Sequence, residues 1–112
     1  MPLESRGFPK PYDYADVPAG QKAVVWRMGG WGDYVAFINK ISVDWYSSTH
    51  WEWVVDGKLV DRIERTISIS EPDEYDPPIV AKRWIRWTYF NESDTARRVG
   101  VLCDGILCRR VA

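Results

Sequence analysis

The most regular alternation of apolar and polar residues in this chain lies at positions 50–55. Every second side chain there is apolar, namely Trp51, Trp53 and Val55, while His50 begins the opposite face. A period of two places the apolar side chains on one face of a β-strand. We therefore predict a strand here, with both tryptophans on the same face.

Asp56-Gly57 follows this strand directly. The dipeptide tolerates the two left-handed positions of a type I′ turn, so it is a strong hairpin signal. The return strand is predicted over residues 59–70. A bulge or a strand end is expected near the polar Asp61 and Arg65, because they interrupt the apolar face.

Further strands are predicted where β-branched and aromatic residues are concentrated. These strands cover residues 23–28, 34–43, 79–91, 97–103 and 106–111. Asp104-Gly105 is a second type I′ signal and is expected to join the last two strands in a hairpin. Residues 70–78 are acidic and proline-rich, which is typical of a loop. Parity within the stretch 34–43 places four apolar residues on one face: Val35, Phe37, Ile41 and Val43.

Residues 1–20 contain four prolines and two glycines. Proline removes a backbone donor and fixes φ, so a helix or a central strand is excluded there. We predict an extended, proline-rich N-terminal arm. Its aromatic residues Phe8, Tyr12 and Tyr14 are candidates for binding a partner, either the arm's own domain or a neighbouring copy.

The predicted fold is all-β. The sequence has no sustained helical stripe with caps. About six to eight strands separated by turn signals indicate an antiparallel β-sandwich, jelly-roll or immunoglobulin-like, with a small barrel as the alternative. A length of 112 residues fits one domain, which we place at residues 21–112 after the arm.

Charge and hydropathy narrow the range of partners. The formal net charge is −1, so no overall field attracts nucleic acid or an anionic membrane. The many aromatic and arginine residues suit a binder of single-stranded nucleic acid, but the missing positive charge counts against it. No apolar run approaches the roughly 20 residues of a membrane helix, and no signal peptide is expected at the N-terminus.

Catalytic constellations are sparse in this sequence. His50 is the only histidine, and nucleophilic catalysis needs a nucleophile, a base and an orienting group. One histidine and two cysteines do not supply the four ligands of a usual zinc site. The acidic residues 71–76 lack the spacing of a calcium loop. We predict a non-enzymatic protein without a cofactor or a metal.

Cys103 and Cys108 flank the predicted Asp104-Gly105 turn. As diagonal neighbours in such a hairpin they would lie about 7 Å apart, which is marginal for a disulfide. A local bridge and two reduced thiols are both open at this stage, and we favour the reduced thiols.

The chain has seven tryptophans and six tyrosines, an unusual number for its length. Large aromatic residues favour strands and recognition surfaces. Trp31 lies among three glycines in the segment 29–33, where it either contacts a partner or folds back onto the core. A platform that stacks against a ligand is predicted from four further aromatic residues: Tyr46, Trp51, Trp53 and Trp84.

The order of several segments resembles small β-sandwich structural and decoration proteins of virus and phage particles. The segments are VPAGQKAVVWRM, WVVDGKLVD, YDPPIVAKRWIRWTYFNES and RRVGVLCDGILCRR, and the resemblance covers roughly residues 17–110. It implies a homo-oligomer that attaches to other virion proteins, with the particle as its location. It assigns no role to any residue.

Two functional hypotheses follow. The first is a virion structural or decoration protein that acts through protein–protein assembly, because aromatic surface in excess of what a small core absorbs suits interfaces. The alternative is a module that binds carbohydrate or another small ligand through exposed Trp and Tyr rings.

Overall fold

The computed structural model describes residues 5–109, and within that range the chain forms nine β-strands and no helix. The strands are β1 (Ser5–Gly7), β2 (Tyr12–Val17), β3 (Lys22–Gly29), β4 (Tyr34–Val43), β5 (Thr49–Val55), β6 (Lys58–Ile63), β7 (Asp73–Ala81), β8 (Trp84–Asn91) and β9 (Arg97–Arg109). The predicted all-β fold is confirmed, with one strand more than the largest number expected.

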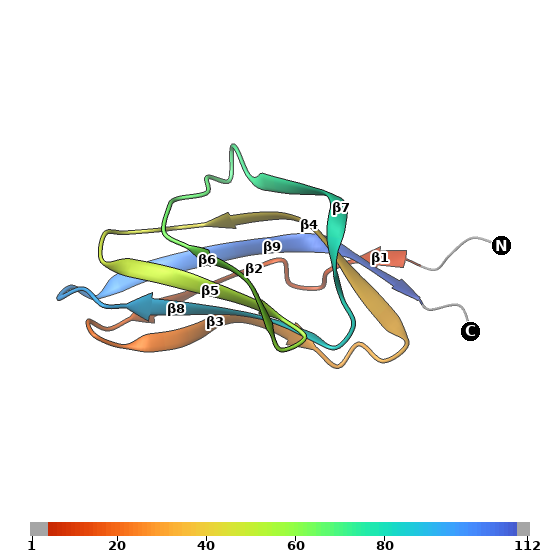
Figure 1. Cartoon of the computed structure of the whole chain (residues 1–112), viewed down its shortest axis with the longest axis horizontal. Helices are drawn as coiled ribbons and strands as arrows, with labels where there is room; N and C mark the ends of the chain where they lie inside the picture. The colour runs from red at the N-terminus through yellow and green to blue at the C-terminus, as the bar shows by residue number, and fades with distance from the viewer. Residues whose placement is uncertain (1–4, 110–112) are drawn as a thin grey trace.

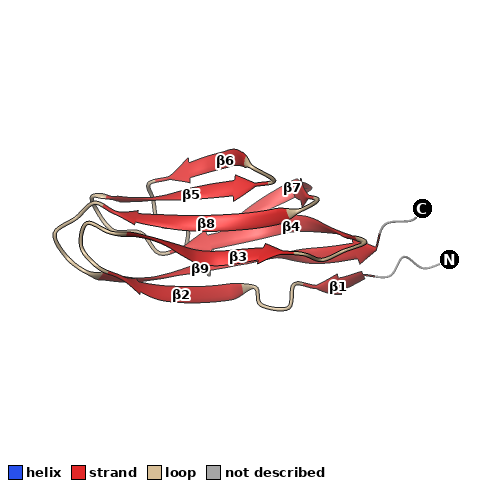
Figure 2. Cartoon of the chain, turned by 90° about the horizontal axis from the view of Figure 1, so that it is seen from below, coloured by secondary structure: helices blue, strands red, loops and turns tan. Residues whose placement is uncertain are grey.

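The strands form two antiparallel sheets packed against each other as a β-sandwich (Figure 1, Figure 2). Sheet 1 has the order β1-β9-β4-β7, and β2 also pairs with β9. Sheet 2 has the order β3-β8-β5-β6. Each sheet therefore has an inner face in the core and an outer face turned toward solvent.

Large aromatic side chains of sheet 2 fill the centre of the core. Trp51, Trp53, Trp87 and Tyr89 are all fully buried. Trp53 and Trp87 are direct cross-strand partners, and their rings stack with centres 4.8 Å apart and planes 12° apart. The prediction that Trp51, Trp53 and Val55 share one face is confirmed, and that face is the inner one.

The predicted Asp56-Gly57 turn is also confirmed. Its φ angles are 51° at Asp56 and 84° at Gly57, as a type I′ turn requires. The Asp56 carboxylate accepts hydrogen bonds from the backbone N–H groups of Lys82, Arg83 and Trp84, at 2.8, 2.7 and 3.0 Å. One turn thus closes the β5–β6 hairpin and fixes the start of β8.

β6 ends at Ile63, so the return strand predicted over residues 59–70 is too long. The predicted strand end near Asp61 and Arg65 is confirmed. Beyond it, the chain crosses from sheet 2 to sheet 1, where Ile67 forms two backbone hydrogen bonds with Val43, of 2.9 and 3.1 Å.

β9 runs without a break, so the hairpin predicted at Asp104-Gly105 is wrong. Gly105 instead allows two strands to approach closely, because a β-carbon there would overlap the backbone carbonyl of Phe37. A bulge in β4 between Ile38 and Lys40 lies opposite this glycine. Glycine inside a strand can mark a close backbone approach rather than a turn.

The prediction that Val35 and Phe37 share a face with Ile41 and Val43 is wrong. The extra residue at the β4 bulge, Asn39, shifts the alternation by one position. Ile41 and Val43 therefore point into the core, whereas Val35 and Phe37 lie half-buried on the outer face.

β7 is an edge strand of sheet 1, so the loop predicted over residues 70–78 ends earlier than expected, before Asp73. Pro77 and Pro78 fall where the pairing of β7 with β4 is interrupted, and an edge strand tolerates such missing donors. The strand predicted over residues 79–91 is split at 82–83 into the end of β7 and the whole of β8.

The described part of the proline-rich segment forms β1 and β2, which both pair with β9. Phe8, between these strands, is 6% exposed, and Val17 at the end of β2 is fully buried. This segment is therefore extended and lies against the same chain. Residues 1–4 of the predicted arm and residues 110–112 of the predicted domain lie outside the described residues.

Candidate functional site

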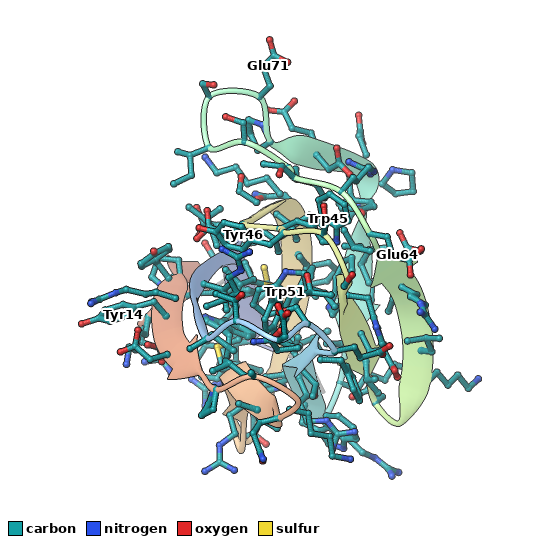
Figure 3. The ribbon with its side chains drawn as sticks, turned by 90° about the vertical axis from the view of Figure 1, so that its left-hand side faces the viewer. Tyr14, Trp45, Tyr46, Trp51, Glu64 and Glu71 are labelled. Atoms are coloured by element: carbon teal, nitrogen blue, oxygen red, sulfur yellow. The ribbon has the colours of Figure 1, made fainter. Side chains whose placement is uncertain are left out.

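The four residues predicted to form a stacking platform do not share one exposed surface. Trp51 and Trp53 are fully buried, and Figure 3 shows Trp51 among the strands. Trp84 is half-buried at the start of β8. Tyr46 is 38% exposed in the loop before β5, and the guanidinium of Arg97 lies 4.4 Å above its ring.

The four residues predicted to bind a partner divide into two pairs. Phe8 is 6% and Trp31 is 9% exposed, so both rings are in the core. The Trp31 indole N–H donates to the carbonyl of Lys82 at 3.2 Å, which places this ring on its own domain. Tyr12 and Tyr14 are 43% and 51% exposed on β2, and in Figure 3 Tyr14 points away from the sandwich.

Tyr12 and Tyr14 form an aromatic pair on the outer face of sheet 1, with ring centres 6.5 Å apart. Tyr12 lies over Gly100, where a β-carbon would overlap its ring and hydroxyl. The guanidinium of Arg98 lies over the ring of Tyr14, 4.4 Å from the ring centre. A glycine and a stacked cation thus hold both rings in place while leaving them accessible.

A groove of about 280 Å³ lies beside Tyr12. Its lining includes the apolar residues Leu102 and Ile69 with the aromatic Tyr12, and the polar residues Ser42, Asp44 and Ser68. Among the lining residues that the structure describes, Asp44 alone is charged. The groove therefore offers stacking and hydrogen bonding without a cation that would attract an anionic ligand.

A second feature of sheet 1 was not found from the sequence. Ile106 of β9 pairs with Phe37 of β4, and Phe37 pairs with Val80 of β7, so the three side chains form a row across the outer face. Ile106 and Val80 are 43% and 44% exposed. We call these three residues the apolar row. The sequence did not predict this row, because the wrong hairpin at residue 105 placed Ile106 on a separate strand from residues 97–103.

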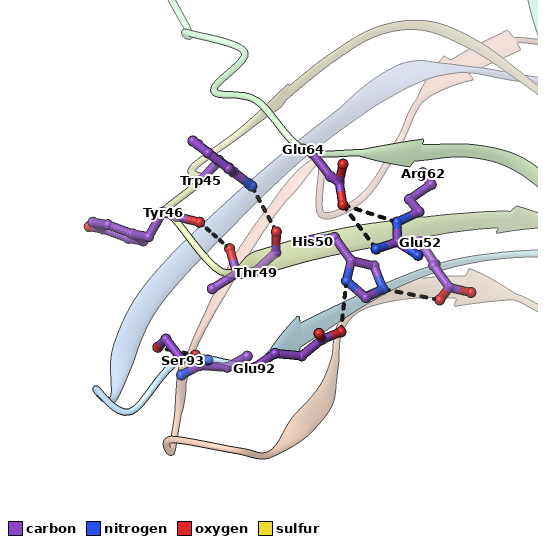
Figure 4. Close-up of polar contacts among 10 residues, drawn as sticks. Trp45, Tyr46, Thr49, His50, Glu52, Arg62, Glu64, Glu92 and Ser93 are labelled. Atoms are coloured by element: carbon purple, nitrogen blue, oxygen red, sulfur yellow. Dashed lines mark hydrogen bonds and ion pairs between the residues drawn. The ribbon is translucent and has the colours of Figure 1, made fainter.

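His50 is the single imidazole, and its contacts are shown in Figure 4. Its side chain is 6% exposed, Nδ1 lies 3.2 Å from Glu92 and Nε2 lies 3.3 Å from Glu52. The ring also stacks on Phe90 at 4.5 Å with planes 6° apart. Both ring nitrogens thus already face a carboxylate, and the imidazole links β5 to the residue that follows β8. This arrangement positions β5 against the turn between β8 and β9.

Figure 4 also shows how the loop before β5 is closed. The indole N–H of Trp45 donates to the carbonyl of Thr49 at 2.9 Å, and the Thr49 hydroxyl donates to the carbonyl of Tyr46 at 2.6 Å. Within residues 5–109, no three His, Cys, Asp or Glu side chains gather closely enough to hold a metal ion.

The two cysteines lie on opposite faces of β9. Cys103 is fully buried, and burial raises the pKa of its thiol to about 12. Cys108 is half-buried on the outer face, and both thiols are free. Five residues of strand separate their α-carbons by roughly 16 Å, beyond the reach of a disulfide. The favoured prediction of reduced thiols is confirmed, although the hairpin geometry behind it is not.

Comparison with known proteins gives no family assignment: no protein-family model matches the chain, and no curated protein matches it. None of the described residues belongs to a helix long and apolar enough to span a bilayer.

Proposed function

We propose that this chain is a non-enzymatic structural protein that works by protein–protein assembly, as a structural or decoration component of a virus or phage particle. Its partners are further copies of itself and other proteins of the particle. The single observation that carries the proposal is the apolar row on the outer face of sheet 1, flanked on the same face by the exposed rings of Tyr12 and Tyr14.

Exposed apolar side chains that gather on one face point to an interface. Isolated apolar residues are normal on a protein surface, but contiguous groups of them mark contact sites. In sheet 1 the row is continuous across three strands, because the strand register places Ile106, Phe37 and Val80 side by side. The central strands β4 and β9 hold Phe37 and Ile106 in a fixed arrangement, so little ordering of these side chains is needed on binding.

The particle is the proposed setting because residues 17–110 resemble, in the order of their segments, structural and decoration proteins of this kind. Such proteins act in many identical copies. A small two-sheet sandwich with an apolar row on one outer face suits repeated contacts between copies better than it suits the enclosure of a substrate.

Ile106→Lys tests the proposal. A charge in the middle of the row is expected to weaken self-association at least tenfold, because the ammonium would have to be desolvated at an apolar contact. Light scattering after size exclusion gives the mass of the wild-type and variant chains. Ile69→Lys is the matched control, since Ile69 is 68% exposed in the loop between β6 and β7, outside both sheets. Equal masses for wild type and Ile106→Lys would reject the row as an interface.

Carbohydrate binding is the second candidate, and the groove beside Tyr12 favours it. An exposed ring next to hydroxyl and carboxylate oxygens suits a neutral sugar, whose C–H face stacks and whose hydroxyls bond. Titration with methyl glucoside, galactoside and mannoside, followed by amide NMR shifts, tests it. Binding should disappear in Tyr12→Ala and persist in Tyr14→Ala. Unchanged spectra with all three sugars would exclude this candidate.

A further inference from the structure

Arg27 of β3 and Arg86 of β8 lie directly opposite each other in sheet 2. Their neighbours Trp26 and Trp87 are buried, so the two arginines point to the outer face, where both are exposed. Like charges in directly opposed positions destabilise a sheet. Among residues 5–109, neither arginine has a carboxylate within 4.0 Å.

The surroundings of this pair increase its positive charge. Arg86 lies over the ring of Trp84 at 5.0 Å, and both line a shallow groove of about 360 Å³ with Arg27. Lys82 and Arg83 lie in the turn before β8, and both are exposed. Their nearest acidic side chain in the turn is Asp56, whose carboxylate is already bonded to three backbone N–H groups. We call Arg27, Lys82, Arg83, Trp84 and Arg86 the basic patch.

The outer face of sheet 1 carries the opposite charge. A groove of about 660 Å³ is lined by Glu74, Asp76 and Asp104, with Lys40 as its one cation. Lys40 pairs in register with Asp104 on one side and Glu74 on the other. Among the described residues, none of these carboxylates forms an ion pair. This acidic groove borders the apolar row, since β4 and β9 contribute to both.

The basic patch and the acidic groove cannot neutralise each other within one molecule. The arginines Arg27 and Arg86 lie on the outer face of sheet 2 and the groove lies on that of sheet 1, with the core between them, and Figure 1 shows β7 at the top of the sandwich and β3 at the bottom. Along the chain, the seven residues 75–81 of β7 separate Glu74 from Lys82 of the basic patch. Each charged surface is therefore free to meet its complement on another molecule.

We propose that a second copy of this chain docks its basic patch in the acidic groove, so that sheet 2 of one copy covers sheet 1 of the next. This inference rests on the proposed assembly function and names its contact. The guanidinium groups of Arg27 and Arg86 enter the groove and bind its carboxylates, for which their planar fork is suited. Trp84 lies against the apolar row. The contact joins two different surfaces, so it is heterologous and repeats from copy to copy.

Charge reversal on each side tests this contact. R27E/R86E reverses the charge at the two positions that enter the groove, and E74K/D76K reverses the charge of the groove, all at exposed positions. Each variant alone is expected to associate at least tenfold more weakly than wild type, because like charges then face each other. An equimolar mixture of the two should assemble again, since both possible contacts between the variants are complementary. Sedimentation velocity measures the mass, and circular dichroism verifies folding.

K22E/R62E is the matched control, because it changes the net charge by the same amount on sheet 2 outside the patch. Its mass should stay that of wild type. If R27E/R86E assembles as wild type does, or if the mixture stays as weak as its components, the contact is wrong while assembly through the apolar row stands. A wild-type chain that is monomeric rejects the contact and the self-assembly together. If Ile106→Lys lowers the mass and neither charge-reversal variant does, copies assemble through the apolar row but not through the charged contact.

Discussion

At Gly105 the sequence predicts a turn, whereas the structure has an unbroken strand in close contact with the backbone of β4. The α-carbon of Gly105 sits so close to the backbone carbonyl of Phe37 that a β-carbon has no room. Gly105→Ala should lower the free energy of unfolding by about 1–3 kcal/mol, because two central strands must move apart. Gly7→Ala is the control, since a β-carbon at Gly7 meets nothing within 4 Å. Urea denaturation of both variants tests this, and equal effects would contradict the close approach.

Asp56 is the second residue on which the fold depends. Burial raises the pKa of its carboxyl, but the hydrogen bonds from the N–H groups of Lys82, Trp84 and Arg83 outweigh burial, so the pKa lies below the ordinary 3.8. A carboxyl whose folded pKa is lowered stabilises the fold above the unfolded pKa. That stabilisation is lost as pH falls through the folded pKa.

Asp56→Asn keeps a residue that accepts positive φ but removes the charge. We expect it to lower the free energy of unfolding by about 1 kcal/mol at neutral pH, and the difference from wild type should disappear once pH falls below the lowered pKa of the folded carboxyl. Urea denaturation at several pH values measures this. A difference that does not change with pH would mean that the carboxylate charge has no role.

At the same scale, the sequence predicted which side chains share a face better than it predicted whether that face is covered. Alternation correctly placed Trp51 and Trp53 together. It held no information on which sheet would lie over them, so they were taken as exposed stacking residues. For the same reason the sequence left open whether Phe8 and Trp31 contact a partner or their own domain, because burial depends on contacts between segments distant in sequence.

At the scale of whole elements, strands with a strong local signal were predicted well. β3, β4 and the β5–β6 turn were found nearly at their true positions. The errors fell where pairing between distant strands overrides local preference. The β4 bulge and the unbroken β9 exist because these two strands accommodate each other at Gly105, and the prolines of β7 are tolerated because it is an edge strand.

The segment that carries β1 and β2 is held to the sandwich by the connection between those strands as well as by their pairing with β9. Phe8 packs near Trp26 with ring centres 6.4 Å apart, and the Trp26 indole N–H donates to the carbonyl of Lys10 at 2.9 Å. This short connection therefore fastens the edge of sheet 1 to β3 of sheet 2.

Phe8→Ala should consequently lower the free energy of unfolding by about 3 kcal/mol. It should also speed proteolysis within the connection between β1 and β2. Tyr14→Ala, at an exposed ring on β2, should cost less than about 0.5 kcal/mol. Thermal melts and limited proteolysis of both variants test this, and a Phe8 variant as resistant as wild type would show that the connection is not what holds the segment.

At the scale of the whole molecule, the sandwich has two outer faces that differ in chemistry. Sheet 1 presents an apolar row beside carboxylates, and sheet 2 presents arginines beside a tryptophan. The net charge of −1 conceals this separation. Residues far apart in the sequence make each surface, so composition alone favoured assembly without locating the faces that would carry it.

The mass of the wild-type chain in solution shows whether this protein assembles with itself. Sedimentation velocity from about 1 to 500 μM spans the affinities expected for weak and moderate protein contacts. If copies assemble as proposed, the mass rises with concentration above the 13.0 kDa of one chain and falls again when salt screens the charged contact. A mass of 13.0 kDa at every concentration, in low and high salt alike, would contradict this self-assembly.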